Sequence, residues 1–260
     1  MGKKAVFAMA LCFAIVACAS HTLLPPEAQR QVIDEYVGTK WHLRHSCFVG
    51  AFYAYPDRYY VSERGFDELP LVQTMSGEPI LPEGPRAILP LGTPVTIAGI
   101  EFPTSSALSG RRLKSPRHFT WVMLEADAPQ ADKPLVLVLT QEMKTPAHFL
   151  SALKKYLQKK DPTPQYEGLS ERIRKAIDRK MPVEGMPADA LLRCRGYPDK
   201  LLRKNTKRGK EEIWIYSDER RVYLLDDVVV KAEGFEQYDL PVWRPAQRDG
   251  HDSGAAAKGG

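Results

Sequence analysis

The sequence predicts an α+β protein with two folded parts, a β-rich part over residues 31–160 and a smaller part over residues 165–240. Short stretches rich in Val, Ile, Tyr and Trp, separated by Pro and Gly, fill much of residues 40–140 and are typical of strands. The second part shows two helical patterns followed by three strand patterns. Between the two parts, the Pro-containing stretch "DPTPQ" breaks the chain and marks the domain boundary.

Composition is ordinary for a folded protein, with 43% hydrophobic and 27% charged residues in 260. The formal net charge is +5, and it falls to +3 once Lys3 and Lys4 are removed with a leader. Such a mild balance does not favour nucleic acid as a partner.

The first residues have the layout of a secretory signal. Lys3 and Lys4 give a positive start, an apolar run covers residues 5–17, and small residues lead into Cys18. The run is shorter than the roughly 20 residues that span a bilayer as a helix, so we do not expect a permanent transmembrane anchor.

The end of this run, "IVAC", resembles the lipobox of bacterial lipoproteins. The resemblance implies cleavage before Cys18, a diacylglyceryl group on its thiol and an acylated amine. Residues 1–17 would be the signal peptide and residues 18–30 a tether. Each buried acyl methylene contributes about 0.8 kcal/mol, so two or three chains anchor durably. Ala19, rather than Asp, follows the cysteine, which by the same resemblance favours the periplasmic face of the outer membrane.

Two further cysteines, Cys47 and Cys194, would remain in the mature chain. An even pair in an oxidising compartment is consistent with a disulfide between distant parts of the chain. Two buried free thiols, packing as small hydrophobic side chains, are the alternative. The sequence leaves both open.

A helical pattern over residues 27–36 leads from the tether into the β-rich part. In "TWVMLE", Trp121 and Met123 alternate with apolar neighbours, so both faces of a buried strand are expected to be covered. The stretch "LPLGTPVTI" predicts a tight turn between two strands and weakly resembles SH3-like barrels. A helix over residues 145–160 ends this part, with Thr145 as its cap and Pro146 in its first turn.

The second part has the order α-α-β-β-β, in which two helices cover one face of an antiparallel meander. Leu169, Ile173 and Ile177 lie four residues apart on the first helix. Pro187 opens the second helix, and Gly196 ends it. The strands "EIWIY", "VYLL" and "VVVKAEGF" follow, with a tight turn at "DD". After residue 240 the polar, Gly-rich segment 241–260 is expected to be a disordered tail.

The spacing "G-M-x(4)-LL-x(3)-G-x-P", followed by "E-x-W-x-Y", resembles the SmpA/OmlA (BamE-like) domain of bacterial outer-membrane lipoproteins. The matching positions are Gly185, Met186, Leu191, Leu192, Gly196, Pro198, Trp214 and Tyr216. The resemblance covers about a quarter of the chain. It implies a small two-layer α/β sandwich on a lipid tether that works by binding rather than by catalysis. The long β-rich segment and the basic loop "KLLRKNTKRGKEE" depart from the family pattern.

The stretch "WHLRHSC" raises two chemical possibilities, a metal site and a cysteine nucleophile. His42, His45 and Cys47 lack partners at the spacing of known zinc motifs, so we predict neither a metal site nor a cofactor. Cys47 together with His118 or His148 would make a cysteine-dependent cell-wall hydrolase. The signatures expected around such a nucleophile are missing, so we do not predict an enzyme.

Two basic runs suit contact with lipid headgroups or an anionic envelope polymer, each cation near such a surface contributing about 1 kcal/mol. The first run holds Arg111, Arg112, Lys114 and Arg117; the second holds Arg203, Lys204, Lys207, Arg208 and Lys210. A solvated loop is the simpler interpretation of both.

Together these features predict a lipid-anchored envelope lipoprotein that is a non-catalytic binding or scaffold component, in outer-membrane protein assembly or envelope integrity. Its partners would be the membrane, through the N-terminal lipid, and an envelope protein or peptidoglycan. The alternative function is a peptidoglycan- or peptide-binding lipoprotein that acts through the β-rich domain.

Overall fold

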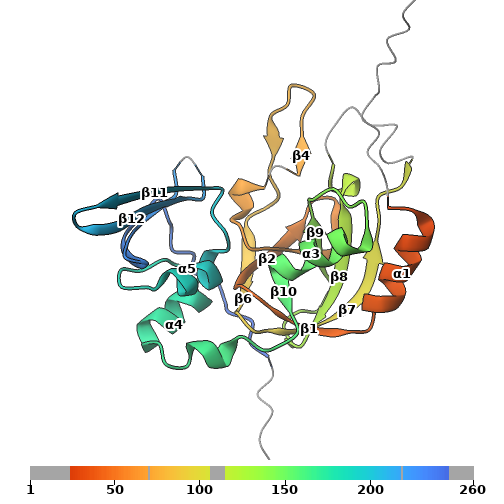
Figure 1. Cartoon of the computed structure of the whole chain (residues 1–260). Helices are drawn as coiled ribbons and strands as arrows, with labels where there is room; N and C mark the ends of the chain where they lie inside the picture. Colours follow the sequence, from red (N-terminus) through yellow and green to blue (C-terminus); the bar gives the residue numbers. More distant parts are fainter. Residues whose placement is uncertain (1–23, 70, 106–114, 218, 246–260) are drawn as a thin grey trace, which may run out of the picture.

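A computed structural model describes residues 24–69, 71–105, 115–217 and 219–245. The predicted signal peptide and Cys18 lie outside this part of the chain. Two sheet-containing units lie side by side: a larger one built on an eight-stranded sheet, and a smaller C-terminal one with four strands and two helices (Figure 1). The α+β class predicted from the sequence is confirmed.

The large sheet has the order β10-β1-β7-β8-β9-β3-β2-β6, and its neighbouring strands are antiparallel except for β3 and β9. Its strands are β1 (Lys40–Leu43), β2 (Cys47–Phe52), β3 (Tyr55–Ser62), β6 (Pro85–Leu89), β7 (Pro94–Glu101), β8 (Thr120–Ala126), β9 (Leu135–Leu139) and β10 (Leu157–Gln158). The short strands β4 (Val72–Gln73) and β5 (Pro79–Ile80) form a separate hairpin.

The sheet is not a closed barrel in the residues described, so the SH3-like expectation is wrong. The predicted turn between β6 and β7 is present, but these strands do not pair with each other. The reason lies in the turn itself. Gly92 N–H donates to the Leu43 carbonyl and Leu43 N–H donates to the Thr93 carbonyl. The turn therefore binds to β1 and carries the chain from one edge of the sheet to the far side.

Both faces of the large sheet are buried. On one face, α1 (Pro26–Tyr36) and α3 (Pro146–Tyr156) pack over a core that includes Val122 and Leu124. On the other face, Trp121 lies in an aromatic cluster with Phe48, Phe52, Tyr60 and Phe66. The alternation predicted for "TWVMLE" is confirmed. The start of α3 is also confirmed, because the Thr145 side chain accepts the N–H of His148.

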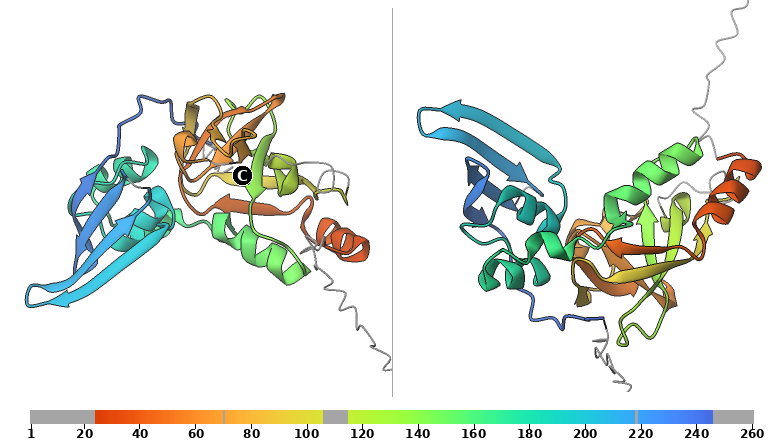
Figure 2. Two further views of the ribbon diagram at one scale, coloured as in Figure 1. Left: turned by 90° about the horizontal axis from the view of Figure 1, so that it is seen from above. Right: turned by 60° about the horizontal axis from the view of Figure 1, so that its bottom comes forward.

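The C-terminal unit consists of α4 (Glu171–Asp178), α5 (Ala188–Arg195), β11 (Lys200–Thr206), β12 (Gly209–Ile215), β13 (Arg221–Leu225) and β14 (Val228–Glu233). Its strands form a meander in chain order, with α4 and α5 over one face. The sequence predicts three strands here and the structure has four. The basic stretch "KLLRKNTKRGKEE", which is predicted to be a loop, begins with the strand β11. Figure 2 shows the β11–β12 hairpin extending beyond the rest of the unit.

Several local predictions for this unit are confirmed. Pro187 is the N-cap residue of α5, and Gly196 ends it with φ of 80°. Asp226 and Asp227 form the tight turn before β14, with φ of 48° and 64°. The "DPTPQ" boundary contains a 3-10 turn (Thr163–Tyr166) whose Tyr166 is buried in the second core.

The chain after β14 returns to the large sheet. Ile88 N–H donates to the Pro241 carbonyl, and Trp243 N–H donates to the Ile88 carbonyl. Tyr238 packs edge-on against Phe48, with ring centroids 5.4 Å apart. The prediction of a disordered tail that begins at residue 241 is therefore wrong for residues 241–244, which contact the folded units. Residues 246–260 lie outside the described part.

Candidate functional site: a cleft at the junction of the two units

A cleft of about 800 Å³ opens where the large sheet meets the C-terminal unit. It is bounded by the ends of β3 and β9, by α3, and by the segment that links α5 to β11. Its volume suits a small molecule or short peptide, since ligand pockets usually have about 300–1,000 Å³. It is lined by Arg44, Tyr60, Val61, Ser62, Glu63, Arg64, Glu68, Leu69, Leu71, Phe119, Leu137, Val138, Thr140, Gln141, Ser151, Lys154, Lys155, Tyr156, Tyr197 and Pro198.

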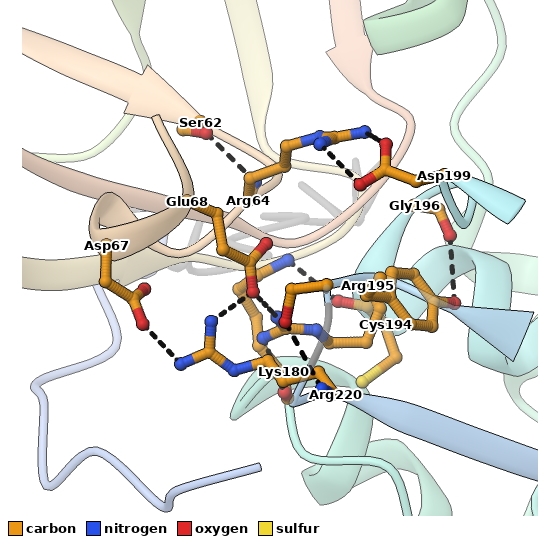
Figure 3. A network of polar contacts seen from close by, with 12 residues as sticks. Ser62, Arg64, Asp67, Glu68, Lys180, Cys194, Arg195, Gly196, Asp199 and Arg220 are labelled. Atoms are coloured by element: carbon orange, nitrogen blue, oxygen red, sulfur yellow. Dashed lines mark hydrogen bonds and ion pairs between the residues drawn. The ribbon is translucent and has the colours of Figure 1, made fainter. Parts of the chain in front are cut away.

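A buried ion cluster joins the two units beneath this cleft (Figure 3). Glu68, in the 3-10 turn Phe66–Glu68 of the first unit, forms an ion pair with Arg220 of the second unit. Arg195 Nη2 lies 3.8 Å from the same carboxylate, and its side chain is 4% exposed. Asp67 binds Arg220 at 2.5 Å. Asp67 is 47% exposed, whereas Glu68 and Arg195 are buried. Removing Glu68 would leave the buried Arg195 without its counter-charge, which typically costs about 3–5 kcal/mol.

A buried lysine ties together the backbones of both units. Lys180 Nζ donates to the carbonyls of Ser46 at 2.6 Å and Cys194 at 2.8 Å. Burial lowers the pKa of Lys180 to about 8. Ser46 N–H also donates to the Arg193 carbonyl at 3.0 Å. These bonds fix the position of α5 against the start of β2, and so fix one side of the cleft.

A second ion pair at the junction is more exposed. Arg64, just after β3, donates through Nη1 to Asp199 Oδ2 at 3.0 Å, just before β11. The two side chains are 37% and 47% exposed. Pairs of this kind contribute only about 0–1 kcal/mol, so the buried contacts carry most of the junction.

One carboxyl in the cleft wall faces a buried imidazole. His45 Nδ1 and Glu63 Oε2 lie 3.3 Å apart, and the side chains are 1% and 15% exposed. Neither atom has a hydrogen-bond partner among the described residues. Burial raises the pKa of Glu63 to about 7. Burial and nearby cations, Lys180 first, lower the pKa of His45 well below 6.5. The 3.3 Å separation allows one hydrogen bond when a single proton lies between the two atoms, and the directions of the two pKa shifts favour that proton on the carboxyl.

Cys47 and Cys194 are free thiols, and both are fully buried. Each contacts a backbone carbonyl at 3.5 Å, that of His45 for Cys47 and that of Ala176 for Cys194. Burial raises the pKa of Cys47 to about 12 and that of Cys194 to about 11. Of the two alternatives left open by the sequence, this structure contains the free thiols.

The histidines considered as partners of Cys47 have other roles. His118 accepts the N–H of Ser115 at the start of the 3-10 turn Pro116–His118. His148 accepts the N–H of Lys144 at the start of α3. A thiol with a raised pKa is a poor nucleophile, because the thiolate is the reactive form.

His42 lies in β1, His45 lies between β1 and β2, and Cys47 begins β2, so the three residues do not share one strand. Among the residues described, no group of three or more His, Cys, Asp or Glu side chains could hold a metal ion. No helix in the same part of the chain is long and apolar enough to cross a membrane.

The first basic run is described only at Arg117, since Arg111, Arg112 and Lys114 lie outside the described residues. Arg117 Nη1 donates to Glu101 at 2.5 Å, and its guanidinium lies 3.8 Å from the centroid of the Trp121 ring. These internal contacts hold the side chain, which is 35% exposed. Its contact with an anionic surface stays a prediction.

The second basic run forms β11, the hairpin tip and the start of β12. Arg203 and Lys210 pair with Glu212, at 2.5 and 3.0 Å. The Glu212 side chain is 2% exposed, and its hydrogen bonds with Trp214, Lys210 and Arg203 outweigh burial and lower its pKa to about 2. Lys204, Lys207 and Arg208 are exposed.

Sequence reasoning did not find the residues of the cleft. Glu63 follows a strand pattern with no motif around it, and Lys180 follows α4 in the sequence "DRKMP", where an exposed lysine is the ordinary expectation. Lys180 adopts a left-handed backbone with φ of 55°. Non-glycine residues rarely adopt this conformation, and the sequence carries no sign of it.

Comparisons with known proteins give no match. No protein-family model matches the chain. At a significant level, no curated protein and no solved structure matches it. The resemblances read from the lipobox and from the C-terminal motif therefore stay predictions.

Proposed function

We propose that the protein is a bacterial envelope lipoprotein, anchored by lipid on Cys18, that binds a partner non-catalytically in the junction cleft. One observation carries the binding role: a cleft of about 800 Å³ is built by both units and held open by buried interdomain contacts. A rigid concave site with aromatic walls and a few polar groups is the usual form of a binding site.

The place of action would be the periplasmic face of the outer membrane, in protein assembly or envelope integrity. The SmpA/OmlA resemblance supports this proposal, and so does the packing of α4 and α5 on one face of a meander. The extra strand β11 and the large N-terminal unit distinguish the chain from a minimal domain of that family. Fold alone does not fix the partner.

A non-catalytic role is supported by the chemistry of the cleft. The ionisable groups Glu68 and Arg64 are held in ion pairs across the junction. Cys47, the residue on which a hydrolase would depend, is buried with a pKa raised to about 12. Its thiol contacts a backbone carbonyl rather than a histidine ring.

The second candidate function is binding of peptidoglycan or peptide through the β-rich unit. The lining of the cleft favours it, because all the lining residues except Tyr197 and Pro198 come from the first unit. The C-terminal unit would then act mainly as one wall of the site.

The anchor is tested by the variant Cys18→Ala. We expect the wild-type protein to fractionate with membranes and to carry lipid at a new N-terminus beginning at Cys18, as measured by intact mass. The variant should be released or should keep its leader. A wild-type mature chain without lipid would refute the anchor, whatever the cleft binds.

The cleft is tested by a photo-crosslinking amino acid placed at Ser151, an exposed residue of α3 that lines it. The matched control is the same amino acid at Gln31, which is exposed on α1 and does not line the cleft. In cells, we expect a discrete adduct with an envelope protein or glycan from position 151 alone. Equal adducts from both positions, or none, would refute the binding role.

A further inference from the structure

The cleft wall contains positive charge that no ion pair neutralises. Lys154 and Lys155 are exposed in the last turn of α3 and line the cleft, and neither forms an ion pair within the described residues. The acidic residue Glu68, by contrast, is held by Arg220. The unneutralised charge in the cleft is therefore mainly cationic, which favours an anionic group on the ligand.

Lys154 and Lys155 are not needed to satisfy the backbone carbonyls at the C-terminal end of α3. Cations are often found at helix C-termini because they interact with the last carbonyls. Here Arg44 already does so, since its Nη1 donates to the Lys154 carbonyl at 2.9 Å and its N–H donates to the Tyr156 carbonyl at 2.8 Å. Leu157 N–H binds the Leu153 carbonyl. Lys154 and Lys155 are thus free to meet a ligand.

Three buried atoms on lining residues lack hydrogen-bond partners in the part of the chain described, and one of them, Glu63 Oε2, faces His45. Arg44 Nε is a donor and Gln141 Oε1 is an acceptor, and neither is bonded in the part of the chain described. Buried polar groups are rarely left in this state. Both atoms have almost no exposed surface, so a ligand that accepts at one position and donates at the other would complete them after a small turn of the two side chains toward the cleft. The end of a peptide does both, because its carboxylate accepts and its backbone N–H groups donate.

The other residues that line the cleft favour a ligand that is anionic and partly apolar, and they disfavour a cationic ligand. Leu69 and Leu71, which are 5% and 3% exposed, and Phe119 line the cleft. Among the described residues that line the cleft, Glu63 is the only carboxyl outside the interdomain ion pairs. It faces the imidazole of His45 and lies in the field of Lys180, Arg64, Lys155 and Arg195.

We infer that the junction cleft binds short peptides by a free carboxylate, which Lys154, Lys155 and Arg44 hold while Gln141 accepts from a peptide N–H. The inference rests on the binding role proposed above and names the chemistry of its ligand. The apolar side chains of the peptide lie against Leu69 and Phe119.

The test uses the full-length protein in detergent and a defined pool of N-acetylated tripeptides, with either free or amidated C-termini. Equilibrium dialysis with mass spectrometry measures which peptides are retained. We expect retention of free-acid peptides carrying apolar side chains, with at least tenfold weaker binding of their amides. The double variant Lys154→Gln/Lys155→Gln should lose at least tenfold in affinity.

The matched control is Lys160→Gln/Lys204→Gln, which removes the same charge from exposed lysines outside the cleft and should bind as the wild type does. Circular dichroism verifies that each variant is folded. Equal binding of acids and amides, or equal loss in both double variants, would overturn the inference. If no tripeptide binds but the Ser151 adduct still forms, the carboxylate inference fails and the binding role stands. If neither occurs, both fail.

Discussion

The two sheets of this protein differ in how much of each strand is covered. In the large sheet, every residue of β9 (Leu135–Leu139) is buried, because helices pack on one face and aromatic side chains on the other. In the small sheet, β11 (Lys200–Thr206) is exposed at every residue but the last. The first sheet is stabilised by its core. The outer strand of the second is held by its hairpin with β12 and by the ion pair of Arg203 with Glu212.

This difference explains why the cleft lies at the junction. A sheet with both faces covered offers a rigid wall, whereas the C-terminal unit, with one sheet face uncovered, is positioned by polar contacts such as Glu68–Arg220 and Lys180 to backbone carbonyls. The site is therefore fixed by interdomain contacts rather than by either core alone.

The largest expected effect comes from the fully covered sheet. Leu139→Ala empties a site that is 0% exposed, at the end of β9 in the main core. We expect a loss of about 2–5 kcal/mol in the free energy of unfolding, because a buried leucine is replaced by a cavity. Urea denaturation followed by tryptophan fluorescence measures it. A loss below 1 kcal/mol would show that this face is not the stabilising core.

A second prediction concerns the proton between Glu63 and His45 in the cleft wall and its effect on the pH dependence of stability. In the wild type, above the lowered pKa of His45 and below the pKa of about 7 of Glu63, the folded pair holds one proton, on Glu63. Between pH 4.5 and 6.5, the ordinary values of the two groups, the unfolded pair holds one proton, on His45. Where these two ranges overlap, the two states bind equal numbers of protons, so this pair adds no pH dependence to stability.

Single variants should break this balance in opposite directions. In Glu63→Gln the unfolded chain alone binds a proton below pH 6.5, so stability should fall as pH drops, until the lowered pKa of folded His45 is reached. In His45→Gln the folded chain alone holds one, up to a pKa of about 7, so stability should fall as pH rises from 4.5 to 6.5. Each slope, relative to wild type, is about 1.4 kcal/mol per pH unit. Urea midpoints at four pH values measure it, and parallel curves for both variants would disprove the shared proton.

The same contrast shows how far sequence reasoning reaches. Strands with apolar residues on both faces, such as the one containing Trp121, could be predicted because consecutive apolar residues in a strand indicate that both faces are buried. The cap at Thr145 and the stop at Gly196 were predicted because each depends on a local hydrogen bond or dihedral angle. These features are set by neighbours in the chain.

What the sequence did not predict depends on distant partners. β11 has no apolar alternation, because it is held by bonds to β12 rather than by burial. The open sheet was mistaken for a barrel because a tight turn does not reveal whether its strands pair. Glu63, Lys154 and Tyr197 line the same cleft although they are far apart in the sequence. No local sequence pattern indicates that they lie close together in the fold.

The smallest expected effect comes from the uncovered sheet. Leu202→Ala removes the same side chain as Leu139→Ala, but from a position that is 43% exposed on β11. Leu202 lies opposite Ile213 on the next strand, so a weak cross-strand contact is lost without a cavity. We expect a change of about 0.5 kcal/mol or less, since exposed substitutions seldom exceed this value. The same urea experiment measures it beside Leu139→Ala. A loss as large as that of Leu139→Ala would mean that another surface covers β11 in solution, because only a covered leucine leaves a cavity when it is shortened.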